Sequence, residues 1–356
     1  MKRSSKRAWL RGIVVVVLLA VVAVAWWQYW PPGGTGPQEP NAADANTGKR
    51  QGDRPGPGPS TQADANTAAG AGATTRPLAP ANGEILKLQK LRAAEVMKMV
   101  GKGNQLVAAK KLAEGRAELS KALLSGKLPP ATEQSVRETL TELAGRMIFS
   151  RDVFDGDPYV GQYTFQTGEV LMKVERKLKL HVPTQILLKV NGVRDARSIR
   201  AGQTIKVVHG PFHAVVSKGK FTMDIYLRRE GCPPAYVRRL KVGLGKNGTT
   251  PVGLWRVGLG RKLIRAPWNP PPNSPVKRSI AWGEPDYPLG KMGYWLGLAG
   301  IDQTTRMHEG YGIHGTNDPS SIGRAESLGC IRLADADIEL VFFLLYEKWS
   351  TVRVRA

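Results

Sequence analysis

The stretch IHGTNDPSSIGRAESLGCIRL, residues 313–333, places a histidine and a cysteine in a segment rich in glycine, serine and asparagine. A glycine adjoins each of them, because Gly315 follows His314 and Gly329 precedes Cys330. A thiol becomes a strong nucleophile as the thiolate, which needs a nearby base or positive charge. Glycine allows close approach of the backbone and frees amide N–H groups that can bind an oxyanion. The pattern therefore indicates a Cys/His acyl-transfer site.

The cysteine count leaves a second interpretation open. Cys232 and Cys330 are the two cysteines of the chain. In an exported protein an even number of cysteines can form a structural disulfide, so spacing alone supports a disulfide as well as a nucleophile. Arg332, two residues after Cys330, could supply positive charge to the thiolate or to a substrate carboxylate.

The other histidines do not predict a metal site. His209 and His213 are separated by residues 210–211, Gly-Pro, which prevents the helix that would align them. The pair at 308–309, His-Glu, lacks the second histidine of the zinc-protease pattern. We expect no metal and no organic cofactor, because a thiolate and fixed amides suffice for acyl transfer.

Length and charge constrain the partners. The chain has 356 residues, which favours more than one module. Its 52 Lys and Arg against 29 Asp and Glu give a formal net charge of +23. Such a balance suits an anionic partner, either nucleic acid, an acidic membrane face or a carboxylate-rich polymer, although it could also serve solubility alone.

The N-terminus predicts a membrane anchor over residues 1–30. Basic residues precede a charge-free apolar run at 12–30 that is long enough to cross most of a bilayer and ends in tryptophan and tyrosine. By the positive-inside rule we expect a single-pass protein of the cytoplasmic membrane, with the remainder in the periplasm or cell-wall space. A signal peptide cleaved after residues 23–25, Ala-Val-Ala, is the alternative, but Trp26 makes that a poor cleavage site.

Two further segments precede the domains with strands. Residues 31–82 are rich in Pro, Gly and Ala, with almost no large apolar side chain, and predict a disordered linker. Residues 83–150 predict a small α-helical, repeat-like domain of three amphipathic helices, separated by the glycine-containing segments 101–104 and 126–130. A protein partner of this domain is one interpretation, and simple packing is the other.

Residues 159–208 predict a βααβ module. A strand at 163–166 is followed by two helices, the second of which ends at Asn191-Gly192 as a helix C-cap does, and by a strand at 204–208. The order resembles a LysM module, whose family binds the N-acetylglucosamine-containing glycan of bacterial cell walls. The residues that carry the likeness are Tyr163, Gly168, Asn191, Gly192, Ile199, Gly202 and Gln203. Glu169 and Val170 depart from it, since Asp or Ser is common after the glycine.

Residues 214–356 predict a mainly-β domain. Apolar residues alternate with other residues over 221–227, which is the period of a half-buried strand, and further strands follow. Residues 334–349 form the clear helical run, with a cap expected near Asp335 or Asp337. These features imply a β-sandwich or open barrel with one helix.

The opening stretch itself resembles a known active site. His314-Gly315-Thr316 and the run from Ser327 to Leu333 are similar to the active-site signature of L,D-transpeptidases with a YkuD-type catalytic domain. Segments 246–253 and 288–298 extend the resemblance. One departure is Leu328, where the family usually has a second histidine.

The resemblance implies a peptidoglycan L,D-transpeptidase. Cys330 would attack the bond between meso-diaminopimelate and D-alanine of a stem peptide, and an amine would resolve the thioester to form a 3-3 cross-link or attach a protein to peptidoglycan. His314 would be the general base, oriented by a carbonyl near Gly315, and the N–H groups of Gly329 and Cys330 would hold the oxyanion. The remaining positioning residues would be Ser327 and Arg332.

Two other classes stay open. The first is a Cys/His cell-wall peptidase, an L,D-carboxypeptidase in which water resolves the acyl-enzyme. The second is a non-catalytic peptidoglycan-binding tether, in which Leu328 marks a decayed enzyme domain. In each case the expected partners are stem peptides and glycan rather than nucleic acid.

Overall fold

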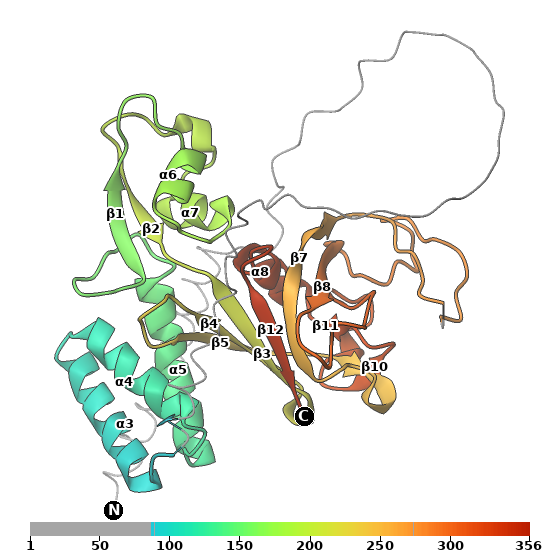
Figure 1. The fold of residues 1–356 in the computed structure, drawn as a ribbon, viewed down its shortest axis with the longest axis horizontal. Helices are drawn as coiled ribbons and strands as arrows, with labels where there is room; N and C mark the ends of the chain where they lie inside the picture. Colours follow the sequence, from blue (N-terminus) through green and yellow to red (C-terminus); the bar gives the residue numbers. More distant parts are fainter. Residues whose placement is uncertain (1–86, 89, 273) are drawn as a thin grey trace, which may run out of the picture. The chain divides into compact units, whose positions relative to one another are not determined.

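The computed structural model describes residues 87, 88, 90–272 and 274–356, which belong to one compact unit (Figure 1). The predicted anchor at 1–30 and the predicted linker at 31–82 lie outside the described residues. Within the described ranges, no helix combines the length and the apolar character needed to cross a membrane.

Three helices open the described part of the chain: α3 (Ala93–Ala108), α4 (Leu112–Leu124) and α5 (Pro130–Met147). The break expected at 101–104 is wrong, because these residues lie inside α3. The chain turns instead after α3, where Lys110 has a φ of 62°. The second break is confirmed, and α5 begins with a proline at its first position.

Packing explains why a glycine stands inside α3. A Cβ on Gly103 would lie 2.7 Å from Leu119 of α4, and one on Gly115 would lie 2.7 Å from Val107 of α3. The two glycines therefore let α3 and α4 approach closely, which outweighs the low helix propensity of glycine.

The next elements have the order strand, helix, helix, strand. They are β1 (Val160–Thr164), α6 (Leu171–Lys177), α7 (Thr184–Asn191), a 3₁₀ turn (Ala196–Ser198) and β2 (Thr204–Val208), and β1 pairs antiparallel with β2. The bounds predicted for the last strand are confirmed, and so is the C-cap, since Gly192 has a φ of 62°. The first strand begins earlier than predicted, because Val160 pairs with Val208.

The rest of the chain builds one mixed eight-stranded sheet in the order β11-β9-β8-β7-β12-β3-β4-β5, with β12 between β7 and β3 (Figure 1). The strands are β3 (Phe212–Ser217), β4 (Thr222–Leu227), β5 (Ala235–Lys241), β7 (Gly253–Ile264), β8 (Tyr294–Gly300), β9 (Gly312–His314), β11 (Ile331–Arg332) and β12 (Thr351–Arg355). A separate pair is formed by β6 (Leu244–Gly245) and β10 (Ala325–Ser327).

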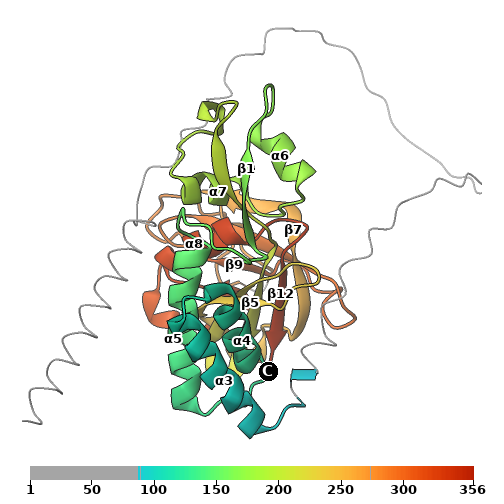
Figure 2. The same ribbon diagram turned by 90° about the vertical axis from the view of Figure 1, so that its left-hand side faces the viewer.

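The mainly-β prediction is confirmed, but the sandwich is not. A single curled sheet replaces two packed sheets, and a register shift in the β7–β8 pairing between Val257 and Lys262 contributes to the curl. The half-buried strand predicted at 221–227 is also wrong, because β4 is buried from Met223 to Leu227. Helix α5 packs beside β5, where Figure 2 shows it, and its Arg137 reaches Asp224 of β4, so the helix covers the face that alternation assigned to solvent.

Helix α8 (Asp335–Leu344) is shorter than predicted. Its N-cap is Ala334, with no side-chain cap, so the expected cap from Asp335 or Asp337 is absent. At the other end the Lys262 ammonium donates hydrogen bonds to the carbonyl oxygens of Phe342 and Leu345. These bonds satisfy terminal carbonyls that another helical turn would have used.

A buried ion network joins α5 to the sheet. The Asp224 carboxylate on β4 accepts hydrogen bonds from Arg137 of α5 at 3.1 Å and from Arg239 of β5 at 2.8 Å and 2.9 Å. The side chains of Asp224 and Arg137 are only 8% and 10% exposed. Their charges are therefore poorly solvated and depend on one another.

We expect Asp224→Asn to lower the free energy of unfolding by about 1–3 kcal/mol, because Arg137 and Arg239 then share only the more exposed carboxylate of Glu133. Chemical denaturation followed by circular dichroism measures the change. Asp195→Asn is the matched control and should change nothing measurable, since the Asp195–Arg197 pair is exposed. Equal stability of the two variants would contradict the assigned role of the network.

Candidate active site

His314 is the last residue of β9 and is fixed on two sides. Its Nδ1 lies 2.5 Å from the carbonyl oxygen of Gly315, and its ring stacks on Trp295 of β8 at 5.5 Å. The side chain is buried. An Nδ1–H that donates to the carbonyl leaves Nε2 as the proton acceptor. The imidazole thus has the tautomer of a general base.

The parallel pairing of β9 with β11 brings the cysteine to the histidine. Ile331 lies opposite Ile313, and Arg332 lies opposite His314. Cys330, one residue before β11, therefore stands at the level of Gly312. Because side chains alternate along a strand, Cys330 is expected on the same sheet face as Arg332 and His314.

The thiol of Cys330 is half-buried and protonated at rest. Its Sγ donates to the carbonyl oxygen of Gly310 at 3.7 Å. Burial raises the pKa of the thiol to about 11, against smaller lowering effects from the Gly312 backbone and the Arg332 charge. Burial also lowers the pKa of His314 to about 4, opposed by its hydrogen bond to Gly315 and assisted by Arg332. The resting pair is a neutral thiol and a neutral imidazole, and the charge of Arg332 acts on both.

The cysteines do not form the disulfide that the sequence allowed. Cys232 and Cys330 are both free thiols. Cys232 lies in the turn before β5, after Arg229, to whose carbonyl oxygen its N–H donates at 3.1 Å. Within the described part of the chain, no group of three or more His, Cys, Asp or Glu residues could hold a metal ion.

The loop before Cys330 corrects one expected role. The Gly329 N–H donates to Ser327 Oγ at 3.1 Å, and the Ser327 hydroxyl donates to the Cys330 carbonyl oxygen at 2.6 Å. The Gly329 N–H is therefore already satisfied and is not available as an oxyanion donor in this arrangement. Gly329 instead serves packing, since a Cβ on it would lie 2.7 Å from the Tyr311 ring and its φ is 138°.

Arg332 carries an unsatisfied donor. Its Nε is buried and has no hydrogen-bond partner in the residues that the structure describes. Its backbone is held in place, because its N–H and carbonyl oxygen both pair with Gly243. A buried guanidinium N–H without a partner is costly, so the position of Arg332 is not explained by its own hydrogen bonds.

Thr250 is a positioning residue that the sequence did not identify. Its hydroxyl accepts the Gly245 N–H at 2.8 Å and donates to the Gly329 carbonyl oxygen at 2.9 Å. It thereby connects β6 to the loop that carries Cys330. The available signal was segment 246–253, which we noted only for its likeness to a family motif.

We expect Thr250→Val to slow acylation of Cys330 at least about tenfold, because the loop loses a fixed position. It should also destabilise the fold by about 1–3 kcal/mol, since two buried backbone groups lose a partner. Intact-mass kinetics with a thiol-acylating reagent measure the first effect, and thermal unfolding measures the second. Thr249→Val is the control, because its hydroxyl bonds only to Lys246 within an exposed turn. Equal acylation by both variants would contradict the positioning role.

Comparisons with known proteins agree on one family. The profile of the YkuD domain, the L,D-transpeptidase catalytic domain, matches residues 211–354. A Bacillus licheniformis protein named "Putative L,D-transpeptidase YkuD" is 30% identical over 184 residues, which cover 49% of this chain and 88% of the relative. The chain belongs to the YkuD family of L,D-transpeptidases. The protein of the same name from Bacillus subtilis is 29% identical over 184 residues, with the same shares covered.

L,D-transpeptidases of this family are acyltransferases with a cysteine nucleophile, which fits the acyl-transfer chemistry of the site. A solved structure named "L,D-transpeptidase from Mycobacterium smegmatis" matches 44% of this chain and 64% of its own, at 14% identity. Its TM-score of 0.29 is too low to support an argument about the fold. Family membership therefore rests on sequence.

Proposed function

We propose that this L,D-transpeptidase transfers the acyl group of a peptidoglycan tetrapeptide stem through a thioester on Cys330. The observation that supports this most directly is the pairing of β9 with β11, which sets Cys330 and a tautomer-fixed His314 on one face of the sheet. Both residues belong to the segment 211–354 that matches the catalytic domain.

The first half-reaction forms the thioester. His314 Nε2 takes the proton of the thiol as Sγ bonds to the carbonyl carbon between diaminopimelate and D-alanine. The oxyanion is bound by backbone N–H donors near Cys330, without that of Gly329. The carbon–nitrogen bond then breaks, and the imidazolium returns its proton to the amine of D-alanine, which leaves.

The second half-reaction reverses these steps with a new amine. The side-chain amine of another stem attacks the thioester carbonyl, His314 takes its proton, and Sγ leaves and is protonated again. The charge of Arg332, which lies opposite His314 in the β9–β11 pairing, orients a carboxylate of the peptide. The products are a 3-3 cross-link, or a protein joined to peptidoglycan when its amine is the acceptor.

The rest of the chain brings the active site to its polymer. We assign glycan binding to the βααβ module at 159–208, and membrane attachment to residues 1–30, with the catalytic domain in the periplasm or cell-wall space. The net charge of +23 suits a carboxylate-rich polymer. The packing of α5 on β4 and β5 accounts for its buried face without a protein partner.

Incubation with disaccharide-tetrapeptide tests the reaction, with the products resolved by mass. We expect a cross-linked dimer and free D-alanine. Disaccharide-tripeptide alone would instead establish a carboxypeptidase, in which water is the acceptor. Unchanged substrate would favour the non-catalytic tether and overturn the proposal.

The acylation rate should be independent of pH from about 5 to 9. The pKa of His314 is lowered to about 4 and that of Cys330 is raised to about 11, so between them the base stays neutral and the thiol stays protonated. The rate should fall only as pH drops towards 4, where the imidazolium can no longer accept a proton. Stopped-flow acylation by imipenem at constant ionic strength measures this, and an acidic limb near pH 6.5, the ordinary histidine value, would contradict the burial effect.

A further inference from the structure

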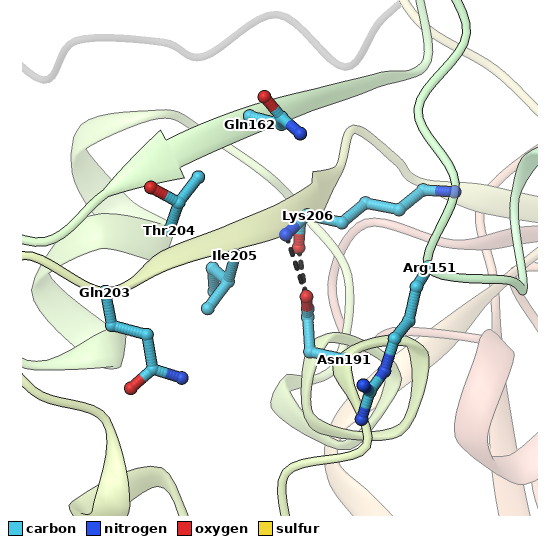
Figure 3. A pocket seen from close by; sticks show the side chains of 7 residues that line it. All are labelled: Arg151, Gln162, Asn191, Gln203, Thr204, Ile205 and Lys206. Carbon is cyan, nitrogen blue, oxygen red and sulfur yellow. Dashed lines mark hydrogen bonds between the residues drawn. The ribbon is translucent and has the colours of Figure 1, made fainter.

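A polar hollow of about 270 Å³ lies beside β2, in the β1–β2 module rather than in the catalytic sheet (Figure 3). Its lining residues are Arg151, Gln162, Asn191, Gln203, Thr204, Ile205 and Lys206. None of these seven residues is acidic, and two are basic. The hollow therefore favours an anionic or neutral polar ligand over a cation.

The side chains of Asn191 and Lys206 are already hydrogen-bonded within the protein and are not free to bind a ligand. Asn191 Oδ1 accepts the N–H of Lys206, and Asn191 Nδ2 donates to the carbonyl oxygens of Lys206 and Leu187, each at 2.8 Å. The side chain of Lys206 runs away from the hollow in Figure 3. Its ammonium donates to the carbonyl oxygens of Met147, Ser150 and Asp152 at 2.6–2.9 Å.

Arg151 is the charged group that remains. It is exposed and has no hydrogen bond or ion pair within the described residues. Its Nη2 lies 2.0 Å from where a Cβ on Gly192 would stand, so the guanidinium rests against the C-terminus of α7 because that position is a glycine. The partial negative charge of a helix C-terminus favours a cation there. The guanidinium thus lies beside this helix end without an anionic partner among the described residues.

Two glutamine amides line the same hollow, and Figure 3 shows them apart from Arg151. Gln203 uses its Oε1 to accept the N–H of Arg200 at 3.2 Å, which leaves its NH₂ group to donate to a ligand. Gln162 has no side-chain hydrogen bond in the described part of the chain. The guanidinium matches a carboxylate, which accepts two parallel N–H bonds from arginine, and the amides can bond other polar groups of the same ligand.

We propose that this hollow binds a carboxylate of the cell-wall polymer and holds the polymer while the active site works. The proposal rests on peptidoglycan being the substrate. The volume lies just below the range of about 300–1,000 Å³ for small-molecule sites, so it fits one amino-acid or sugar unit. The carboxylate belongs either to a stem peptide or to the lactyl group of a glycan from which the peptide has been removed. Recognition of this charge differs from the binding of neutral N-acetylglucosamine that a LysM likeness implies.

Sedimentation of the full-length chain with purified sacculi tests the proposal at fixed, moderate salt. Arg151→Gln should weaken binding to untreated sacculi about tenfold, the loss expected for one charge-assisted pair. Arg176→Gln, the same charge change at an exposed position of α6, should weaken it less than about twofold. The affinity of Arg151→Lys for sacculi should lie between those of the two glutamine variants, because lysine keeps the charge but cannot form bidentate hydrogen bonds.

Chemically altered sacculi identify the carboxylate. Blocking carboxylates with carbodiimide and ethanolamine should erase the difference between the wild-type chain and Arg151→Gln. Amidase treatment, which removes stem peptides and exposes lactyl carboxylates, should erase it for a stem-peptide ligand and preserve it for a glycan ligand. Equal binding by Arg151→Gln and Arg176→Gln on untreated sacculi would overturn the site, as would a difference that survives blocking.

Acylation by imipenem separates this proposal from the proposed function. Arg151→Gln should be acylated on Cys330 at the wild-type rate, because the hollow is lined by the β1–β2 sheet and the thiol adjoins the eight-stranded sheet. Failure of the wild-type chain to form an acyl-enzyme would count against the proposed reaction and leave the binding result standing.

Discussion

Cys330→Ala abolishes acyl-enzyme formation, whereas Cys232→Ala leaves it unchanged. This is the largest effect that we expect, because alanine has no nucleophilic atom and covalent catalysis has no substitute in the site. The register of β9 and β11 puts Cys330 on the sheet face of His314, the expected base, and near the charge of Arg332, while Cys232 lies in the turn before β5. Intact mass after incubation with imipenem measures the adduct, and D-alanine release measures the natural reaction.

Both alanine variants should have the thermal stability of the wild-type chain within a few degrees, since each loses one half-buried thiol. A stability comparison therefore excludes loss of folding as the cause of inactivity. An adduct that persists on Cys330→Ala, or that disappears on Cys232→Ala, would mean that the assigned nucleophile is wrong.

His314→Ala should slow acylation about 10²- to 10⁴-fold, the usual loss when a general base is removed. The effect should be at the large end because the thiol pKa is raised to about 11, so little thiolate forms without the base. Raising the pH should partly rescue the variant, since hydroxide then generates the thiolate. The acylation rate of the wild-type chain should show no comparable rise until the pH approaches 11.

His209→Ala is the matched control for His314→Ala. Burial lowers the pKa of His209 to about 4, as it does for His314, but His209 lies between β2 and β3, outside the site. Its loss removes an equivalent imidazole without removing the base. Equal acylation rates for the two variants, with no rescue of His314→Ala at high pH, would mean that another group deprotonates Cys330.

Local sequence patterns determined the elements whose partners are near in the chain. The proline and glycine around residues 126–130 separate α4 from α5, and Gly192 ends α7, because these residues restrict or permit specific backbone angles whatever surrounds them. The turn and the cap therefore depend on covalent structure and local sterics alone. The Cys/His pair was a candidate from its glycine neighbours, but spacing left a disulfide open as well, and the resemblance to the L,D-transpeptidase signature decided between them.

Tertiary packing decided the features where local patterns gave the wrong answer. Gly103 lies inside α3 because Leu119 occupies the space that a side chain at position 103 would need. Strand β4 is buried on both faces because α5 covers the second face. Neither fact is visible in the residues themselves, since both depend on a neighbour distant in sequence. The same holds for the end of α8, where terminal carbonyl oxygens accept hydrogen bonds from Lys262 of β7.

The sequence by itself selected the residues expected to carry the chemistry, and the tertiary structure decided how they can act. Parallel pairing of β9 with β11 sets Cys330 and His314 on one face, and it is non-local because the intervening loop must first close. The hydroxyl of Thr250 bonds to Gly245 of β6 and to Gly329, and the N–H of Gly329 bonds to Ser327 of β10. These hydrogen bonds form only in the folded chain. Burial then sets both pKa values, because desolvation depends on every atom around a group and not on its neighbours in the chain.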